Sequence, residues 1–217
     1  MRIKKFLLCI MATLCFSFAI VSCKTDTISA DQTAGALYNL YVLSNGDECK
    51  KLGITDEEIQ QVLDTQKSES IKATRLNFTK GGLPITNAEL EEIYKAQLEA
   101  LKKLTPTIKI ESEDKDKVVV KISTTYIDLI GADTKAAEEA ISEATKSGKT
   151  SKSDISKIYI KHLIENIKGI EPSSDTKEDT FEFKKQNIEI DGKTKEAWFP
   201  SNMVTFGRTL GNMITGQ

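Results

Sequence analysis

Histidine, cysteine and arginine are scarce in this sequence, and each scarcity excludes a class of site. His162 is the only histidine, which rules out metal sites that need two histidine ligands. Of the four cysteines, Cys9 and Cys15 lie in an N-terminal leader that we expect to be removed. Cys23 and Cys49 are then too few for a site built on several thiolates. We therefore expect no metal, no cofactor and, if Cys23 is modified, no internal disulfide.

Positive charge is also limited. The 217 residues carry 30 basic and 32 acidic side chains, and removing the leader takes away three bases, so the formal charge falls from −2 to −5. Only Arg75 and Arg208 then remain as arginines, although the planar guanidinium is the group that best matches phosphate. An acidic, arginine-poor surface argues against nucleic acid as a partner and against electrostatic binding to anionic lipid.

The first 22 residues have the order of a secretion signal. Met1–Lys5 is a short basic segment, and residues 6–21 are almost entirely apolar. This run is short for a membrane-spanning helix, which needs about 20 residues. It ends in Ile20-Val21-Ser22-Cys23, which resembles the lipobox of bacterial lipoproteins. We predict a signal peptide over residues 1–22 and lipid attachment at Cys23. An ordinary signal peptide with an incidental cysteine is the alternative.

Lipidation of Cys23 would determine where the protein works. A diacylglyceryl thioether on the sulfur and a palmitate-type chain on the amine give two or three acyl chains, enough for stable anchoring. The predicted location is the cell membrane, facing outside the cytoplasm, with the membrane bound through the N-terminal lipid. Residues 23–29 are predicted to be the lipidated cysteine and a short tether of about 20 Å. Residues 30–217 are predicted to form a single α+β domain.

Three helices are predicted in the first half of the chain. Apolar spacing predicts one over Ala30–Leu43. Thr55 and Thr86 each precede a glutamate by three residues, the capping-box pattern that begins a helix. We expect the helix after Thr55 to continue toward Leu76 and to stop before Gly82.

The second half combines strands with three more helices. Residues 107–111 and 117–127 are predicted to pair as a hairpin with a charged tip. Asp133 is expected to cap a helix that turns its apolar residues inward: Ala136, Ala137, Ala140, Ile141 and Ala144. The remaining predicted elements are a helix, three strands and a closing helix: 155–167, 180–184, 187–190, 195–199 and a helix capped by Ser201.

This order favours the α+β class, with helices packed on one face of a small antiparallel sheet. By analogy alone, such an arrangement resembles the cystatin-like or nuclear-transport-factor-like architectures.

Five short landmarks follow one another along the chain: Leu37–Tyr41, Lys51–Ile54, Thr124–Asp128, Glu171–Ser174 and Trp198–Ser201. In this order they resemble a family of bacterial lipoproteins catalogued as a domain of unknown function (number five-one-zero-five). The resemblance spans roughly residue 30 to the C-terminus, with a stretch over residues 187–195 that is longer than usual for the family. It implies an envelope lipoprotein and no catalytic residues, because the family has no assigned activity.

No combination of residues predicts a catalytic centre. His162 lies among Ile158, Tyr159 and Leu163, so we expect a half-buried structural histidine rather than a general base. Gly148-Lys149-Thr150 ends like a phosphate loop but lacks its first glycine.

Acidic residues gather in short groups, such as Glu57–Glu58, Glu89–Glu92 and Glu138–Glu139. We expect these groups near solvated helix starts, where the helix dipole favours negative charge. Asp114 and Asp116 lack the glycine and the final glutamate of a calcium loop, so a charged hairpin tip is expected.

For the late aromatic residues and for Cys49, the sequence allows either a functional role or a structural one. The late aromatic residues could line a pocket or pack the core, and the core is favoured: Phe181, Phe183, Trp198, Phe199 and Phe206. Cys49 could be a reactive thiol, but it lacks a clear basic activator and is expected to be inert.

We rank a membrane-tethered, non-enzymatic binding or interaction module first. Its ligand-binding residues are not identified by the sequence, and both an envelope protein and a small ligand are open as partners. An inhibitor or immunity-type lipoprotein is the alternative. An enzyme with a polar cavity ranks third, and Tyr126, His162 and Trp198 are the residues it would use.

Overall fold

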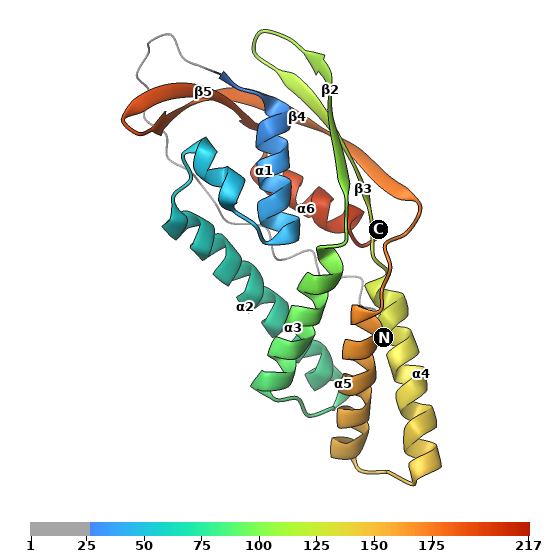
Figure 1. Cartoon of the computed structure of the whole chain (residues 1–217). Helices are drawn as coiled ribbons and strands as arrows, with labels where there is room; N and C mark the ends of the chain where they lie inside the picture. Colours follow the sequence, from blue (N-terminus) through green and yellow to red (C-terminus); the bar gives the residue numbers. More distant parts are fainter. Residues whose placement is uncertain (1–26) are drawn as a thin grey trace.

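The computed structural model describes residues 27–217, so the predicted leader and the predicted lipid site at Cys23 lie outside the described residues. Within this range the chain forms a mixed α+β fold in which helices pack against a curled sheet, as predicted (Figure 1). The largest cluster of buried apolar side chains runs from Ala30 to Ile214 and includes residues of both helices and strands. The described part of the chain therefore contains its own core.

The helices of the first half begin where the sequence predicts. Helix α1 spans Ala30–Leu43 and ends at Ser44, which adopts a left-handed conformation with φ 54°. Thr55 and Thr86 cap α2 (Asp56–Gly81) and α3 (Asn87–Leu101), each through a complete capping box. A short 3-10 helix, η1 (Asp47–Leu52), connects α1 to α2. Helix α2 continues past Leu76 and stops before Gly82, as predicted, because Gly82 supplies its left-handed C-cap.

The five strands formed by residues 27–217 lie in the order β1-β5-β4-β3-β2. Strands β2 (Pro106–Glu113) and β3 (Val118–Thr125) form the predicted hairpin, with Asp114 and Asp116 at its exposed tip. Strand β4 (Thr176–Ile190) is one long strand where two short ones were predicted, and a turn at Asp191-Gly192 leads into β5 (Lys193–Pro200). These four strands are antiparallel.

The first strand was not predicted. Thr27 and Ile28, expected to belong to the tether, form β1 and pair in parallel with Glu196 and Ala197 of β5. Two residues of the expected tether therefore belong to the sheet.

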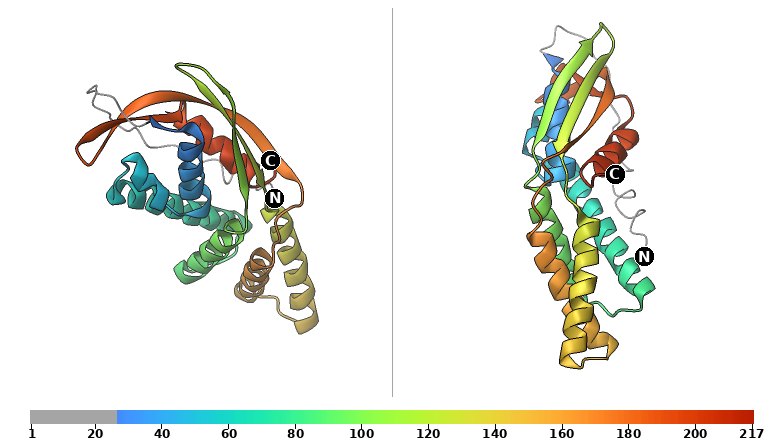
Figure 2. Two further views of the ribbon diagram at one scale, coloured as in Figure 1. Left: turned by 45° about the horizontal axis from the view of Figure 1, so that its top comes forward. Right: turned by 90° about the vertical axis from the view of Figure 1, so that its right-hand side faces the viewer.

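The core fills the concave face of the sheet, where α1 and α6 (Met203–Met213) lie (Figures 1 and 2). Alternate residues of β3 point inward, and Val118, Val120 and Ile122 are buried there. The late aromatic residues are all buried, so their predicted core role is confirmed: Phe181, Phe183, Trp198, Phe199 and Phe206.

Helices α4 (Leu129–Ser147) and α5 (Lys152–Lys168) form a hairpin that extends away from the sheet (Figure 2). Two predicted caps in this half are wrong by a few residues. Asp128, not Asp133, caps α4 by accepting a 2.8 Å hydrogen bond from the Gly131 amide. Asn202, not Ser201, caps α6, since its side chain accepts from the Thr205 amide at 2.8 Å.

The predicted inward face of α4 is partly wrong. Ala136, Ala140 and Ala144 are buried, but Ile141 is 66% exposed. Helix α5 contacts the alanine face and leaves the neighbouring face, with Ala137 and Ile141, to line an open groove.

Candidate functional site

Four helices of the lower half form a trough. Helices α3 and α5 contact each other along the middle, while α2 and α4 lie on the outer sides (Figure 1). The trough has a cavity volume of about 560 Å³, within the range of small-ligand sites. Residues of the main core form part of its wall, among them Phe78, Ile93 and Leu163.

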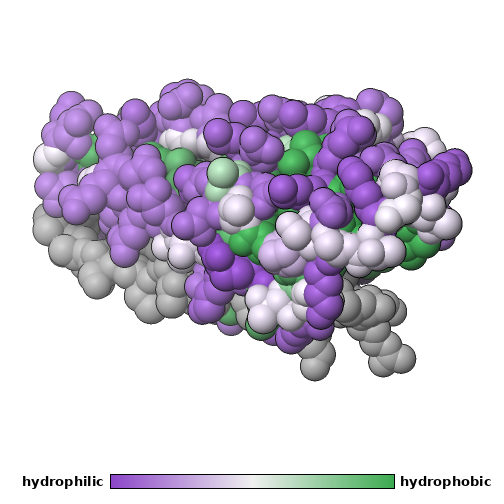
Figure 3. All heavy atoms as spheres, turned by 90° about the horizontal axis from the view of Figure 1, so that it is seen from below, coloured by the Kyte–Doolittle hydropathy of each residue, from purple (hydrophilic) through white to green (hydrophobic). Residues whose placement is uncertain are grey.

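Most side chains in the trough are apolar. Helix α2 and the loop after it contribute Phe78 and Leu83, and α3 contributes Ile93. The largest share comes from the α4–α5 hairpin: Leu129, Ala137, Ala140, Ile141, Ile155, Tyr159, Leu163 and Ile167. When the molecule is viewed from below, hydrophobic side chains are visible between hydrophilic ones (Figure 3). We refer to this four-helix cavity as the groove.

Polar contacts hold neighbouring helices of the groove together. Ser70 on α2 donates to the Gln97 side chain on α3 at 3.1 Å. Ser156, which is buried on α5, donates to the carbonyl of Pro84 in the α2–α3 loop. Lys103, just after α3, donates to the carbonyls of Lys168 and Ile170 at the end of α5, at 3.2 and 2.6 Å. These contacts fix the spacing of the helices and therefore the width of the groove.

The hydroxyl of Tyr159 on α5 donates a hydrogen bond to the carboxylate of Asp133 on α4, inside the groove. Burial, the hydrogen bond to Asp133 and the negative charge of that carboxylate all raise the pKa of Tyr159. The hydroxyl therefore stays protonated and remains a donor. Its ring also packs against Phe78, with the ring centroids 5.4 Å apart. Asp133 is thus held by a fixed partner rather than acting as the predicted cap.

The only charged side chains that line the groove in the described part of the chain are Asp133 and Glu138. Neither forms an ion pair with a described residue. The Glu138–Glu139 pair lies in the middle of α4 and not near a helix start, because α4 begins earlier than predicted. The groove is therefore apolar with a negative edge.

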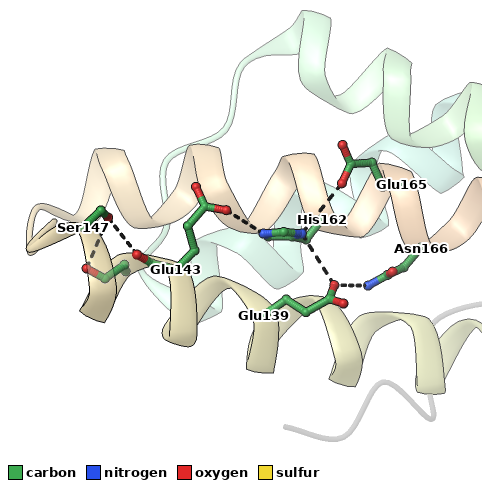
Figure 4. Close-up of polar contacts among 7 residues, drawn as sticks. Glu139, Glu143, Ser147, His162, Glu165 and Asn166 are labelled. Atoms are coloured by element: carbon green, nitrogen blue, oxygen red, sulfur yellow. Dashed lines mark hydrogen bonds and ion pairs between the residues drawn. The ribbon is translucent and has the colours of Figure 1, made fainter.

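His162 lies outside the groove lining, on the side of α5 that meets three carboxylates (Figure 4). Its Nε2 is 2.9 Å from Glu143, and its Nδ1 is 3.5 Å from Glu139 and 3.7 Å from Glu165. The hydrogen bond to His162 is the main reason why the pKa of Glu143 is lowered. The imidazole is half-buried and joins α4 to α5, which confirms the predicted structural role.

The three residues proposed for an enzyme have separate surroundings. Tyr126 follows β3 and faces the ammonium of Lys177, whereas Trp198 packs in the core below Lys185. None of the three, His162 included, lines the groove.

Cys49 is fully buried in η1, and its thiol donates to the carbonyl of Ala36 at 3.4 Å. Burial, reinforced by the charge of Glu48, raises the pKa of Cys49 to about 12. The predicted inert role is therefore confirmed. Among the described residues, no group of three or more histidine, cysteine or acidic side chains could hold a metal ion.

The groove was not predicted, although the sequence of α4 contains a signal for it. Ala136, Ala140 and Ala144 form one stripe, and Ala137 and Ile141 form a second one beside it. A single neighbouring helix covers only one such stripe. The width of the apolar face therefore indicates a second, uncovered surface.

Comparison with solved structures shows a related fold. A crystal structure described as that of "a putative lipoprotein (ycdA)" from Bacillus subtilis matches with a TM-score of 0.60 and 18% sequence identity. The match covers 84% of this chain and 56% of that chain, so this protein spans little more than half the length of its structural neighbour. The neighbour therefore establishes similarity of fold.

No family model and no curated protein matches the sequence. The resemblance to the family numbered five-one-zero-five stays a prediction. Within the described residues, no helix is long and apolar enough to cross a membrane.

Proposed function

We propose that the protein is a lipid-anchored extracytoplasmic lipoprotein whose four-helix groove binds an apolar ligand without chemical conversion. The observation that carries the binding role is the groove itself, with a volume of about 560 Å³ and a mostly apolar lining between α2, α3, α4 and α5. Ligand sites of this size are typically apolar cavities with a few placed polar groups. Asp133 and Tyr159 are such groups.

The anchor is supported by the predicted lipobox that ends at Cys23, by the resemblance to a lipoprotein family and by the description of the structural neighbour. Strand β1 begins at Thr27, so three residues separate it from the predicted lipid site. Such a segment reaches about 14 Å at most. The edge of the sheet formed by β1 would then lie close to the membrane, while the α4–α5 hairpin, which forms one wall of the groove, extends away from the sheet (Figure 2).

Labelling with radioactive palmitate tests the anchor. Cells that produce the full chain should incorporate label into the protein, and the Cys23→Ser variant should lose the label and leave the membrane fraction. A matched Cys49→Ser variant should keep both properties, because Cys49 is buried in the fold. Equal labelling of the Cys23→Ser variant would contradict this part of the proposal.

Nile red, an uncharged dye that fluoresces in apolar surroundings, tests the groove. Residues 24–217, which retain the whole described fold, should enhance its emission. Ala137→Trp fills the groove and should reduce the enhancement several-fold, because a bulky ring replaces the space for the dye. Ala88→Trp, at an exposed position on α3 outside the groove, is the matched control. Equal emission from both variants and the parent protein would mean that the groove does not bind the dye.

A further inference from the structure

We propose that the groove recognises a single-chain amphiphile with a cationic head group, and that Asp133 and Glu138 receive this group. The proposal rests on the proposed binding function and adds the chemical class of the ligand. An uncharged apolar ligand would leave two features of the groove unused: its two carboxylates have no cationic partner among the described residues, and both lie on one side of the groove.

The charges of the groove are of one sign. Asp133 and Glu138 come from α4, and the side chains recorded in the lining include no lysine, arginine or histidine. The ammonium of Lys152 lies beside Gly82, just past the lining residue Gly81, and contributes no ion pair to either carboxylate. A phosphate or carboxylate head group placed beside Asp133 and Glu138 would therefore meet like charge.

The neighbouring face of the same helix, which contacts α5, shows a different arrangement. Glu139 and Glu143 each contact the ring of His162, and Glu139 also accepts a 2.8 Å hydrogen bond from the Asn166 side chain. The carboxylates that face α5 thus have partners within the fold, while the carboxylates that face the groove have no cationic one. This contrast points to a positive partner that comes from outside the chain.

Asp133 is suited to this role because it is partly buried and held in place. One carboxylate oxygen accepts from Tyr159, but a carboxylate has capacity for several hydrogen bonds, so acceptor sites remain free. A neutral tail that covered Asp133 would remove water from a carboxylate that has no cationic partner, and this desolvation costs free energy. An ammonium group offsets this cost with a charge-assisted hydrogen bond.

The dimensions favour a single chain. A volume of about 560 Å³ accommodates one tail and a small head group, and the apolar walls stabilise a buried tail by about 0.8 kcal/mol for each methylene. Exposed Ile141 extends the apolar surface at the edge of α4, where the emerging part of a tail would cover it.

Three probes with the same ten-carbon alkyl tail differ only in the charge and type of the head group: decylammonium, undecanoate and decyl maltoside. Each is used below the concentration at which it forms micelles and is titrated against residues 24–217 loaded with Nile red. We expect decylammonium to displace the dye at a concentration about fivefold lower than decyl maltoside, and undecanoate to be the weakest. The advantage of decylammonium should decrease in high salt.

Two variants locate the effect. Asp133→Asn keeps the size of the side chain and its acceptor for Tyr159 but removes the charge, and it should bring decylammonium close to decyl maltoside. Glu138→Gln, at an exposed position that is not needed for folding, should reduce the advantage in part. Glu99→Gln, on the exposed side of α3, is the matched control and should leave it unchanged.

The outcomes distinguish this inference from the function on which it rests. Equal displacement by all three probes would overturn the cationic specificity and leave apolar binding intact. A cationic preference that survives both carboxylate variants would also overturn it, since it would reflect only the net charge of the protein. Failure of all three probes to displace the dye would contradict apolar binding itself. A dimer that Ala137→Trp dissociates would show that the groove binds a second copy, and would overturn both.

Discussion

The hydroxyl groups of Tyr38 on α1 and Thr124 on β3 lie 2.6 Å apart, in the fully buried core between the helix and the sheet. Thr124 also donates to the carbonyl of Thr125, so the tyrosine hydroxyl donates to threonine in a short chain of hydrogen bonds. Burial raises the pKa of Tyr38 to about 12, and the hydrogen bond to Thr124 partly opposes this shift. The pair joins segments 86 residues apart in the sequence.

A double-mutant cycle on this pair should show strong coupling. Thr124→Val leaves the Tyr38 hydroxyl buried without a partner and should lower the free energy of unfolding by about 1–3 kcal/mol. Tyr38→Phe should cost about 1 kcal/mol, because Thr124 retains its bond to Thr125. The double variant should lose less than the sum. Urea titrations of the four proteins measure these differences, and strict additivity would contradict the pairing.

The buried thiol of Cys49 should make the free energy of unfolding depend on pH in the alkaline range. Its folded pKa of about 12 exceeds the ordinary value of 9.0, so its thiol stabilises the fold below pH 9 and loses this contribution as the pH rises through 12. Tyr38 and Tyr41 act in the same direction, with pKa values raised from 10.0 to about 12. We therefore expect the free energy of unfolding to fall between pH 9 and pH 12.

Two measurements check the role of Cys49. The native protein should not react with a disulfide reagent at about pH 8, whereas the protein in guanidinium chloride should react at once. The stability advantage of the parent protein over Cys49→Ala should also narrow as the pH rises from 9 to 12. Rapid reaction of the native thiol would mean that η1 opens or that the cysteine is not buried.

The helix starts in the first half of the chain could be predicted because they depend on local sequence. The groove could not be predicted because it depends on how distant helices pack together. The capping boxes at Thr55 and Thr86 depend on residues three positions apart, so the sequence predicts both helix starts correctly. Asp128 and Asp133 are both suitable caps, and only the end of β3 selects Asp128. The exposure of Ile141 depends on where α2 and α5 lie around α4, and no local pattern specifies that arrangement.

Gly53 should be far less tolerant of alanine than Gly148. Both glycines have positive φ values, 76° and 65°, which cost other residues about 1–2 kcal/mol. A Cβ on Gly53 would also lie 2.9 Å from the backbone carbonyl oxygen of Glu189 on β4, while a Cβ on Gly148 meets nothing within 4 Å. Gly53→Ala should therefore reduce the melting temperature well beyond Gly148→Ala. Similar losses would mean that η1 can move away from β4.

His162 should control the acidity of Glu143. The hydrogen bond from the imidazole lowers the pKa of Glu143 below 4.5, and the charges of Lys161 and Lys149 act in the same direction, while burial opposes the shift. Because this pKa is depressed in the folded protein, its contribution to stability is present above pH 4.5 and is lost as the pH falls through the folded value. His162→Asn should therefore raise the Glu143 pKa toward 4.5.

An NMR titration of the Glu143 carboxyl carbon measures this shift directly. Lys157→Asn, at an exposed position on the same helix without a recorded contact to Glu143, is the matched control and should leave the titration unchanged. The stability advantage of the parent protein over His162→Asn should decrease as the pH falls below 4.5. Protonation of Glu143 removes the carboxylate charge that the imidazole stabilises. The same Glu143 pKa in the parent and in His162→Asn would assign the lowered value to the neighbouring lysines, and the α4–α5 contact through His162 would then make no electrostatic contribution.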